Sequence, residues 1–68
     1  MDRYYVHTLT DAQGDHEVHK STCDKLPKSE NRIYLGEFSN CQQAVIEAKK
    51  RYSNSNGCYW CSRDCHTT

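Results

Sequence analysis

The sequence has few of the apolar residues that build a hydrophobic core. The set A, V, I, L, M, F, W, Y and C makes up 35% of the 68 residues. Adding glycine raises that to roughly 40%, below the usual 45–50% of soluble domains. A domain this short buries only about 60% of the surface that its unfolded chain exposes. We therefore expect residues 1–68 to form one small domain that is stabilised by a covalent or metal cross-link.

Long apolar runs and an excess of one charge are also missing. No stretch approaches the roughly 18 apolar residues of a membrane helix, and the N-terminal segment MDRYYVHTLT does not resemble a secretory signal. Nine basic and nine acidic side chains cancel, so the basic excess that favours phosphate binding is absent. We read the basic run Lys49-Lys50-Arg51 as solvated helix charges. These absences predict a cytoplasmic protein that does not enter a membrane.

Cysteine, in contrast, is abundant, with five residues in the chain. Disulfide frameworks usually have an even cysteine count and belong to secreted proteins. The odd count and the expected reducing compartment therefore favour a metal site over disulfides. A thioredoxin-like role for Cys58 and Cys61 is disfavoured, because no long helix follows them.

The residue pattern predicts an α+β fold, with a small three-stranded antiparallel sheet and one packed helix, stapled by zinc. Aromatic and β-branched residues predict a strand over residues 3–9. Alternating side-chain character over 16–20 predicts the second strand of a hairpin, and a third strand is expected over 32–38. Residues 21–31 and 53–57 are rich in polar and turn-forming types, so we expect loops there.

A helix is expected near residues 40–52. Ser39 and Gln42 fit a capping box, with Ser39 as the N-cap. One helical face is apolar and is expected to pack on the sheet, with Cys41 as a buried free cysteine. That face consists of Cys41, Ala44, Val45, Ala48 and Tyr52. The aromatic side chains are expected to fill the rest of the core rather than to stack on bases.

Two short pairs predict a zinc site. Cys58-x-x-Cys61 has the spacing with which two thiolates in a tight turn bind one tetrahedral zinc ion. His19-x-x-x-Cys23, at the end of the second expected strand, supplies two more ligands. Together the four residues form a closed Cys3His set, which is typical of structural zinc.

The remaining histidines and cysteine leave alternatives open. Cys65 and His66 are expected to lie in an exposed tail, but His66 is close enough in sequence to Cys61 to displace His19 from the metal. His7 and His16 have no cysteine partner at ligand spacing. We expect these two side chains to lie on the surface of their strands.

The order of these motifs resembles the Ada-type metal-binding domain, known from a bacterial alkylation-repair protein and from stand-alone relatives. The family has a strand hairpin, a C-x-x-x-C or H-x-x-x-C pair, a strand, a helix and a closing C-x-x-C. The resemblance spans about residues 4–61. The corresponding segments here are His19-Lys-Ser-Thr-Cys23, Asn31-Arg-Ile-Tyr-Leu35, Ser39 through Ala48 and Cys58-Tyr-Trp-Cys61.

One departure from the family bears on mechanism. In the repair protein, the first residue of the C-x-x-x-C pair is a zinc-bound thiolate that accepts a methyl group from DNA. Here His19 stands at that position, and an imidazole lacks the nucleophilic sulfur. The resemblance therefore implies metal binding without methyl transfer at this position.

These observations predict a zinc-stabilised interaction module that is not an enzyme, with a protein or nucleic acid as its partner and no small-molecule substrate. A closed four-ligand site has no open position for a catalytic water. Two alternatives are a thiolate-dependent activity, either alkyl acceptance or redox exchange, through Cys58, Cys61 or Cys65, and nucleic-acid binding through the basic run and Arg63.

Overall fold

Four strands form one mixed sheet in the structure, which is a computed structural model and describes residues 1–67. Neighbouring strands follow the order β3-β1-β2-β4. β1 is antiparallel to β2 and β3, whereas β4 is parallel to β2. The α+β class is confirmed, but the prediction of three antiparallel strands is wrong. The strands are β1 (Asp2–His7), β2 (His16–Lys20), β3 (Arg32–Phe38) and β4 (Ser55–Gly57).

The fourth strand lies in a segment whose composition is typical of a loop. Ser55–Gly57 has no β-branched or aromatic residue, and it is held in place by hydrogen bonds to distant parts of the chain. The His16 amide donates to the Asn54 carbonyl at 2.7 Å, and the Cys58 amide donates to the Val18 carbonyl at 2.9 Å. Tertiary pairing therefore overrides the low strand propensity of these residues.

The hairpin of β1 and β2 determines which side chains face the helix. Its turn is closed by Asp11, whose carboxylate accepts the amides of Gln13 and Asp15 at 2.9 Å each. Val6 pairs with Val18 and Tyr5 with His19. Because successive side chains of a strand alternate between faces, both valines lie on one face and His19 lies on the other.

The helix α1 (Cys41–Lys49) is shorter than expected and starts from a different cap. The Asn40 side chain accepts the Gln43 amide at 2.9 Å, so Asn40 is the N-cap and the assignment to Ser39 is wrong by one residue. The Ser39 hydroxyl instead donates to the Gln43 side-chain carbonyl at 3.2 Å. The expected packing is confirmed, because Ala44 and Ala48 are fully buried.

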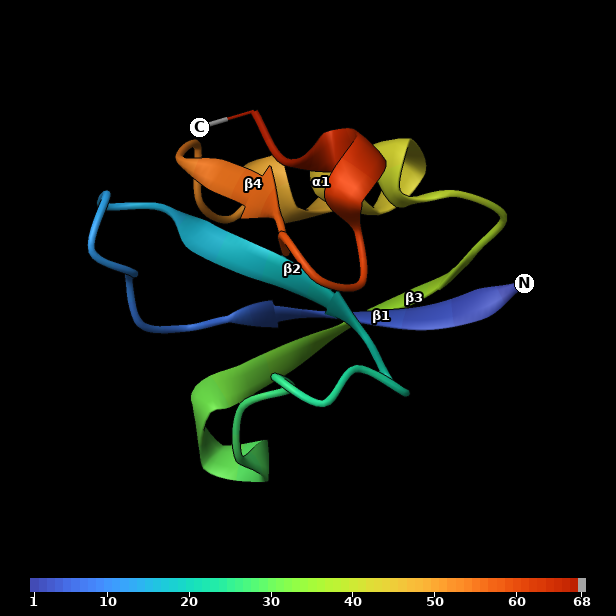
Figure 1. Cartoon of the computed structure of the whole chain (residues 1–68), viewed down its shortest axis with the longest axis horizontal. Coiled ribbons are helices and arrows are strands. Elements are labelled where there is room, and N and C mark those ends of the chain that lie inside the picture. The colour runs from blue at the N-terminus through green and yellow to red at the C-terminus, as the bar shows by residue number, and fades with distance from the viewer. Residues whose placement is uncertain (68) are drawn as a thin grey trace.

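The core lies between α1 and one face of the sheet, and Figure 1 shows the helix on one side of the strands. It consists of Tyr4, Val6, Val18, Cys41, Ala44, Ala48 and Cys65. The prediction of an aromatic core is wrong for Tyr34, Tyr59 and Trp60, which are exposed. Within residues 1–67, no helix combines the length and the apolar character needed to cross a membrane.

A disulfide joins Cys41, at the start of α1, to Cys65 in the short 3-10 helix η2 (Arg63–Cys65). Cys41 is buried as expected, but the prediction that it is free is wrong. The assignment of Cys65 to an exposed tail is also wrong, because only 8% of this residue is exposed. The odd cysteine count thus divides into one disulfide pair and three free thiols.

Candidate metal centre

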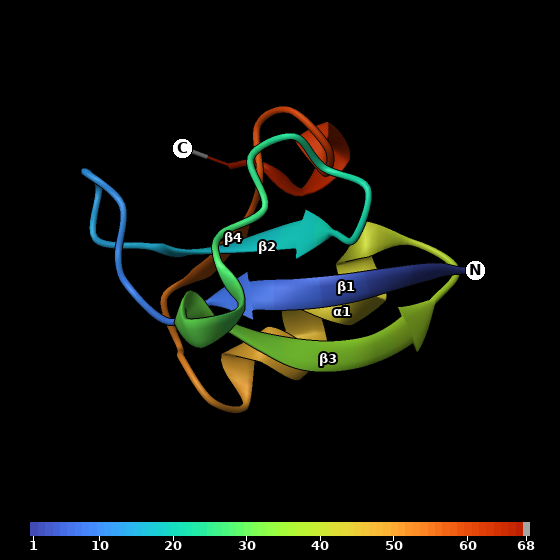
Figure 2. The ribbon, with the colours of Figure 1, turned by 90° about the horizontal axis from the view of Figure 1, so that it is seen from below.

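The structure brings the two predicted ligand pairs together. His19 lies near the end of β2, Cys23 lies in the loop that follows, and Cys58 and Cys61 lie in the turn after β4. Figure 2 shows both loops beyond the β2 edge of the β1–β2–β3 strands. One ligand atom from each residue lies within 4.8 Å of all the others.

Local hydrogen bonds hold the cysteines in place. The Cys23 amide donates to the Lys20 carbonyl at 3.0 Å, and the Cys23 carbonyl accepts the Leu26 amide at 3.1 Å, so Cys23 sits between two tight turns. Cys58 is bonded to β2 through its amide, and its carbonyl accepts the Ser62 amide at 2.9 Å. These hydrogen bonds fix the loop that carries Cys23 and the turn that carries Cys58.

The spacing of the sulfur atoms fits a single tetrahedral ion. The Sγ atoms of Cys23 and Cys58 are 3.9 Å apart. A tetrahedral zinc ion with Zn–S bonds of about 2.3 Å holds two sulfurs about 3.8 Å apart. Only small adjustments would therefore be needed for the cluster to enclose an ion.

Each sulfur of the cluster also accepts a backbone amide. Lys20 donates to Cys61 at 3.2 Å, Lys25 to Cys23 at 3.4 Å, and Trp60 to Cys58 at 3.4 Å. Amides that point at sulfur stabilise negative charge on it. The backbone is therefore arranged for three thiolates, which is the form that binds metal.

His19 has a buried ring whose polar atoms have no hydrogen-bond partner. Only 1% of the residue is exposed. Its two nitrogens are the only buried side-chain nitrogen or oxygen atoms of residues 1–67 that lack a hydrogen bond. The nearest carboxylate oxygen, from Glu17, is 3.6 Å from Nε2, which is too long for a good hydrogen bond. Unpaired buried polar atoms are costly, and a metal ion would satisfy one of these.

The three thiols differ in acidity. Burial raises the pKa of Cys23 to about 12 and also raises the pKa of Cys58. At Cys61 the effect of burial is outweighed by the nearby His19 ring and the Lys20 amide, and the pKa falls to about 6. Without metal, Cys61 is thus the thiolate of the cluster at neutral pH.

The other candidate ligands lie elsewhere. The His66 ring nitrogen Nδ1 is within hydrogen-bond distance of the Gly57 carbonyl at 3.0 Å, so His66 is not placed to displace His19. His16 stacks on Tyr52, with ring centroids 3.8 Å apart, instead of lying free on the strand surface. Cys65 is committed to the disulfide. Sequence spacing gave no signal for this pairing, because Cys41 and Cys65 are 24 residues apart.

An exposed aromatic surface adjoins the cluster. Trp60 is 69% exposed and Tyr59 is 41% exposed. Lys25 Nζ lies 5.8 Å from the Trp60 ring, and the Arg63 guanidinium lies 4.9 Å from the Tyr59 ring. A hollow of about 370 Å³ opens between the Cys23 loop and Trp60. It is lined by Thr22, Cys23, Asp24, Lys25, Trp60 and Cys61.

Comparisons with known proteins identify no relative. No protein-family model, no curated protein and no solved structure matches this chain. The resemblance to the Ada-type domain therefore stays a prediction from the ligand pairs and the order of the elements around them.

Proposed function

We propose that the protein is a small zinc-stabilised interaction module without catalytic activity. The proposal depends mainly on one observation, the convergence of one imidazole and three thiols within 4.8 Å. Thiolate and imidazole ligands in a tetrahedral arrangement favour zinc among the common divalent ions. A set of four protein ligands leaves no coordination position for water or substrate.

The exposed aromatic side chains support the interaction part of the proposal. Trp60 lines the same hollow as Cys23 and Cys61. Tyr59 is in edge-to-face contact with Trp60, with ring centroids 5.0 Å apart. Tryptophan and tyrosine are enriched among the residues that dominate binding energies at protein interfaces. Zinc would fix the turn that carries both rings, so metal binding and partner binding would be linked.

Native mass spectrometry of the protein purified without added chelator tests the metal site. We expect a mass excess of one zinc ion, which is lost on denaturation. The variant Cys58→Ser should lose the ion, whereas His66→Ala should keep it, because His66 lies outside the cluster. A wild-type protein that folds and binds no zinc at micromolar concentrations would refute the proposal.

The hollow beside the cluster favours one competing function, a thiolate-dependent activity. Cys23 and Cys61 are partly exposed and line this hollow, so a reagent can approach them. Titration with a thiol reagent separates the two functions. Thiols of the cluster that react only after chelation support the module, whereas one fast thiol in the zinc-bound form supports chemistry.

Nucleic-acid binding is the other competing function, and it can be tested in the same preparation. We expect weak binding of a DNA oligonucleotide without a steep dependence on salt, because the net charge is zero. The basic run at the end of α1 is partly neutralised, since Lys50 pairs with Glu47 at 3.2 Å. Tight binding that weakens steeply with salt would favour a nucleic-acid partner instead.

A further inference from the structure

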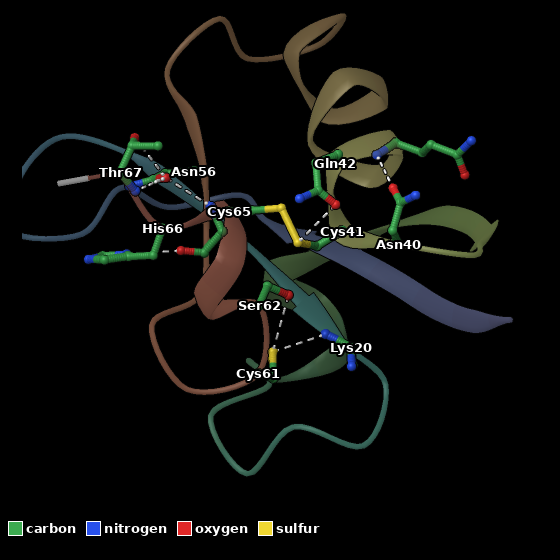
Figure 3. Close-up of a disulfide and its surroundings, with 12 residues drawn as sticks. Lys20, Asn40, Cys41, Gln42, Asn56, Cys61, Ser62, Cys65, His66 and Thr67 are labelled. Atoms are coloured by element: carbon green, nitrogen blue, oxygen red, sulfur yellow. Dashed lines mark hydrogen bonds between the residues drawn. A yellow bond between two sulfur atoms is a disulfide. The ribbon is translucent and has the colours of Figure 1, made fainter.

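The segment from Cys58 to Cys65 is tied to the rest of the molecule by two different cross-links. Two ligands of the proposed metal site, Cys58 and Cys61, lie in its first half. Cys65 ends the segment and is bonded to Cys41 at the start of α1. In Figure 3, Cys61 points toward Lys20 of β2, Cys65 points toward α1, and Ser62 lies between them.

Hydrogen bonds and close packing connect the two ends of this segment. The Ser62 amide donates to the Cys58 carbonyl and the Cys65 amide donates to the Ser62 carbonyl, each at 2.9 Å. Two consecutive turns thus join the metal ligands to the disulfide. Gly57 packs so closely that a Cβ atom there would lie 2.6 Å from Cys65 Cβ and 2.6 Å from the Ser62 carbonyl oxygen. The segment therefore fits against β4 as one unit.

Hydrogen bonds to two strands and one covalent bond to α1 fix the position of this unit. Just after Cys65, the His66 ring lies 3.0 Å from the Gly57 carbonyl and the Thr67 amide donates to the Asn56 side chain at 3.0 Å, so this end is also hydrogen-bonded to β4. Toward β2, the bonds are from the Cys58 amide to Val18 and from the Lys20 amide to Cys61 Sγ. Toward α1, the Cys41–Cys65 disulfide links the segment covalently to the helix, and both cysteines are buried. Breaking the disulfide would remove the covalent link to α1 at a point four residues after Cys61 and leave this end of the segment held by its packing and hydrogen bonds to β4.

We propose that the redox state of the Cys41–Cys65 disulfide sets the metal affinity of the cluster. This inference rests on the proposed metal site. With the disulfide formed, Cys58 and Cys61 are held near their bound positions. With it reduced, the segment has lost its covalent link to α1 and has more freedom to move, so metal binding must also restrict that motion, and the cost of doing so weakens the affinity. The reductant is an external dithiol, which gives up two electrons and two protons and becomes a disulfide itself. Cys41 and Cys65 take up those electrons and protons and become two thiols.

The coupling has to be reciprocal. If the oxidised protein binds zinc more tightly, zinc must stabilise the disulfide by the same free energy. We expect an affinity loss of about tenfold on reduction. For a two-electron couple a tenfold change corresponds to about 30 mV. Zinc should therefore shift the midpoint potential of the disulfide by about 30 mV toward more negative values.

The first test compares zinc affinities without any reductant. Competition with a chromophoric zinc chelator is measured for the oxidised wild type and for the double variant Cys41→Ser with Cys65→Ser. We expect the double variant to bind about tenfold more weakly. Leu35→Ala is the matched control, because it removes core packing from β3, at the opposite edge of the sheet from β4. It should change the affinity by less than the double variant does.

The second test keeps the wild-type sequence, so it decides the matter even if the double variant fails to fold. The Cys41–Cys65 pair is titrated in glutathione redox buffers with and without zinc, and its state is followed by peptide mapping. A midpoint that zinc does not shift would mean equal zinc affinities in the two redox states and would overturn the inference while leaving the metal site intact. Failure of both redox forms to bind zinc would refute the proposed function itself, and the inference with it.

Discussion

At the scale of single residues, Glu17 is placed to orient His19 of the proposed metal site. The Glu17 side chain is only partly exposed, and its Oε1 lies 3.6 Å from His19 Nε2. A small rotation would make a hydrogen bond, leaving Nδ1 for the metal. Carboxylates commonly fix metal-bound histidines in this way, and their loss costs about 10–100-fold in metal affinity.

The variant Glu17→Ala is therefore expected to weaken zinc binding about tenfold, whereas Glu17→Gln, which keeps an oxygen acceptor, should lose much less. Chelator competition measures both. Glu37→Ala serves as the control, because Glu37 pairs with Arg3 at a distance from the cluster, at the sheet edge. Equal losses of zinc affinity in the alanine and glutamine variants would show that the side-chain oxygen at position 17 does not orient the His19 ring.

The acidity of the three thiols predicts how zinc affinity depends on pH. At pH 7–8 Cys61 is already a thiolate, because its pKa is about 6. Cys23 and Cys58 still carry protons there, because burial raises the pKa of both. Binding must release those two protons. The affinity should therefore rise with pH, by about a hundredfold per pH unit in this window.

Calorimetry in buffers of different ionisation enthalpy measures this proton release directly. We expect about two protons per zinc ion at pH 7.5. A release close to three would mean that Cys61 is protonated in the metal-free protein. A release near zero would contradict the assignment of Cys23 and Cys58 as ligands.

At the scale of elements, the start of α1 offers a sharp comparison between neighbouring residues. Asn40 caps the helix through the Gln43 amide, whereas the Ser39 hydroxyl reaches only a side chain. Asn40→Ala should lower the free energy of unfolding by about 1 kcal/mol. Ser39→Ala should lower it by much less. Chemical denaturation of the zinc-loaded protein checks this, and a larger loss for Ser39→Ala would restore the capping box that the sequence predicts.

At the scale of the whole molecule, the disulfide and the proposed zinc site would together compensate for a small core. Structural zinc contributes an apparent binding free energy of about 10–16 kcal/mol in small peptides at pH 7, while whole domains are stable by about 5–15 kcal/mol. The disulfide closes a loop across 24 residues, and chain-entropy estimates give such a loop about 3–4 kcal/mol. Zinc binding would thus be comparable to the total stability of a domain, and the disulfide would be a large fraction of it.

Chelation under reducing conditions should therefore unfold most of the domain. With the disulfide intact, chelation should leave more secondary structure and a lower melting temperature than in the zinc-bound protein. Circular dichroism with and without a strong chelator measures both states. An unchanged melting temperature after verified removal of the metal from the reduced protein would contradict the zinc-staple hypothesis.

The disulfide also bears on where the protein works. Disulfides persist mainly in oxidising compartments and are rare in the cytosol. The cytoplasmic location predicted from the sequence depended on the odd cysteine count and on the absence of a signal-like segment. The structure accounts for the odd count in another way, with one disulfide and three free thiols, so the count no longer supports that location.

The sequence by itself determined the features that depend on near neighbours in the chain. Alternation was enough to predict β2 and β3, and the 3.6-residue period was enough to predict the buried face of α1. The spacing of each ligand pair likewise follows from the reach of a single turn. The convergence of the two pairs was predicted because a tetrahedral ion needs four ligands, and the structure brings His19 together with the three thiols.

Only the tertiary structure decided the features that join distant parts of the chain. Ser55–Gly57 becomes a strand because the free edge of β2 pairs with it, and nothing in its own composition favours that state. Cys41 and Cys65 meet because α1 and η2 pack side by side over the core. Trp60 is exposed because the turn between Cys58 and Cys61 holds its ring away from that core. Local propensity cannot report such contacts, since their free energy comes from partners that are tens of residues away.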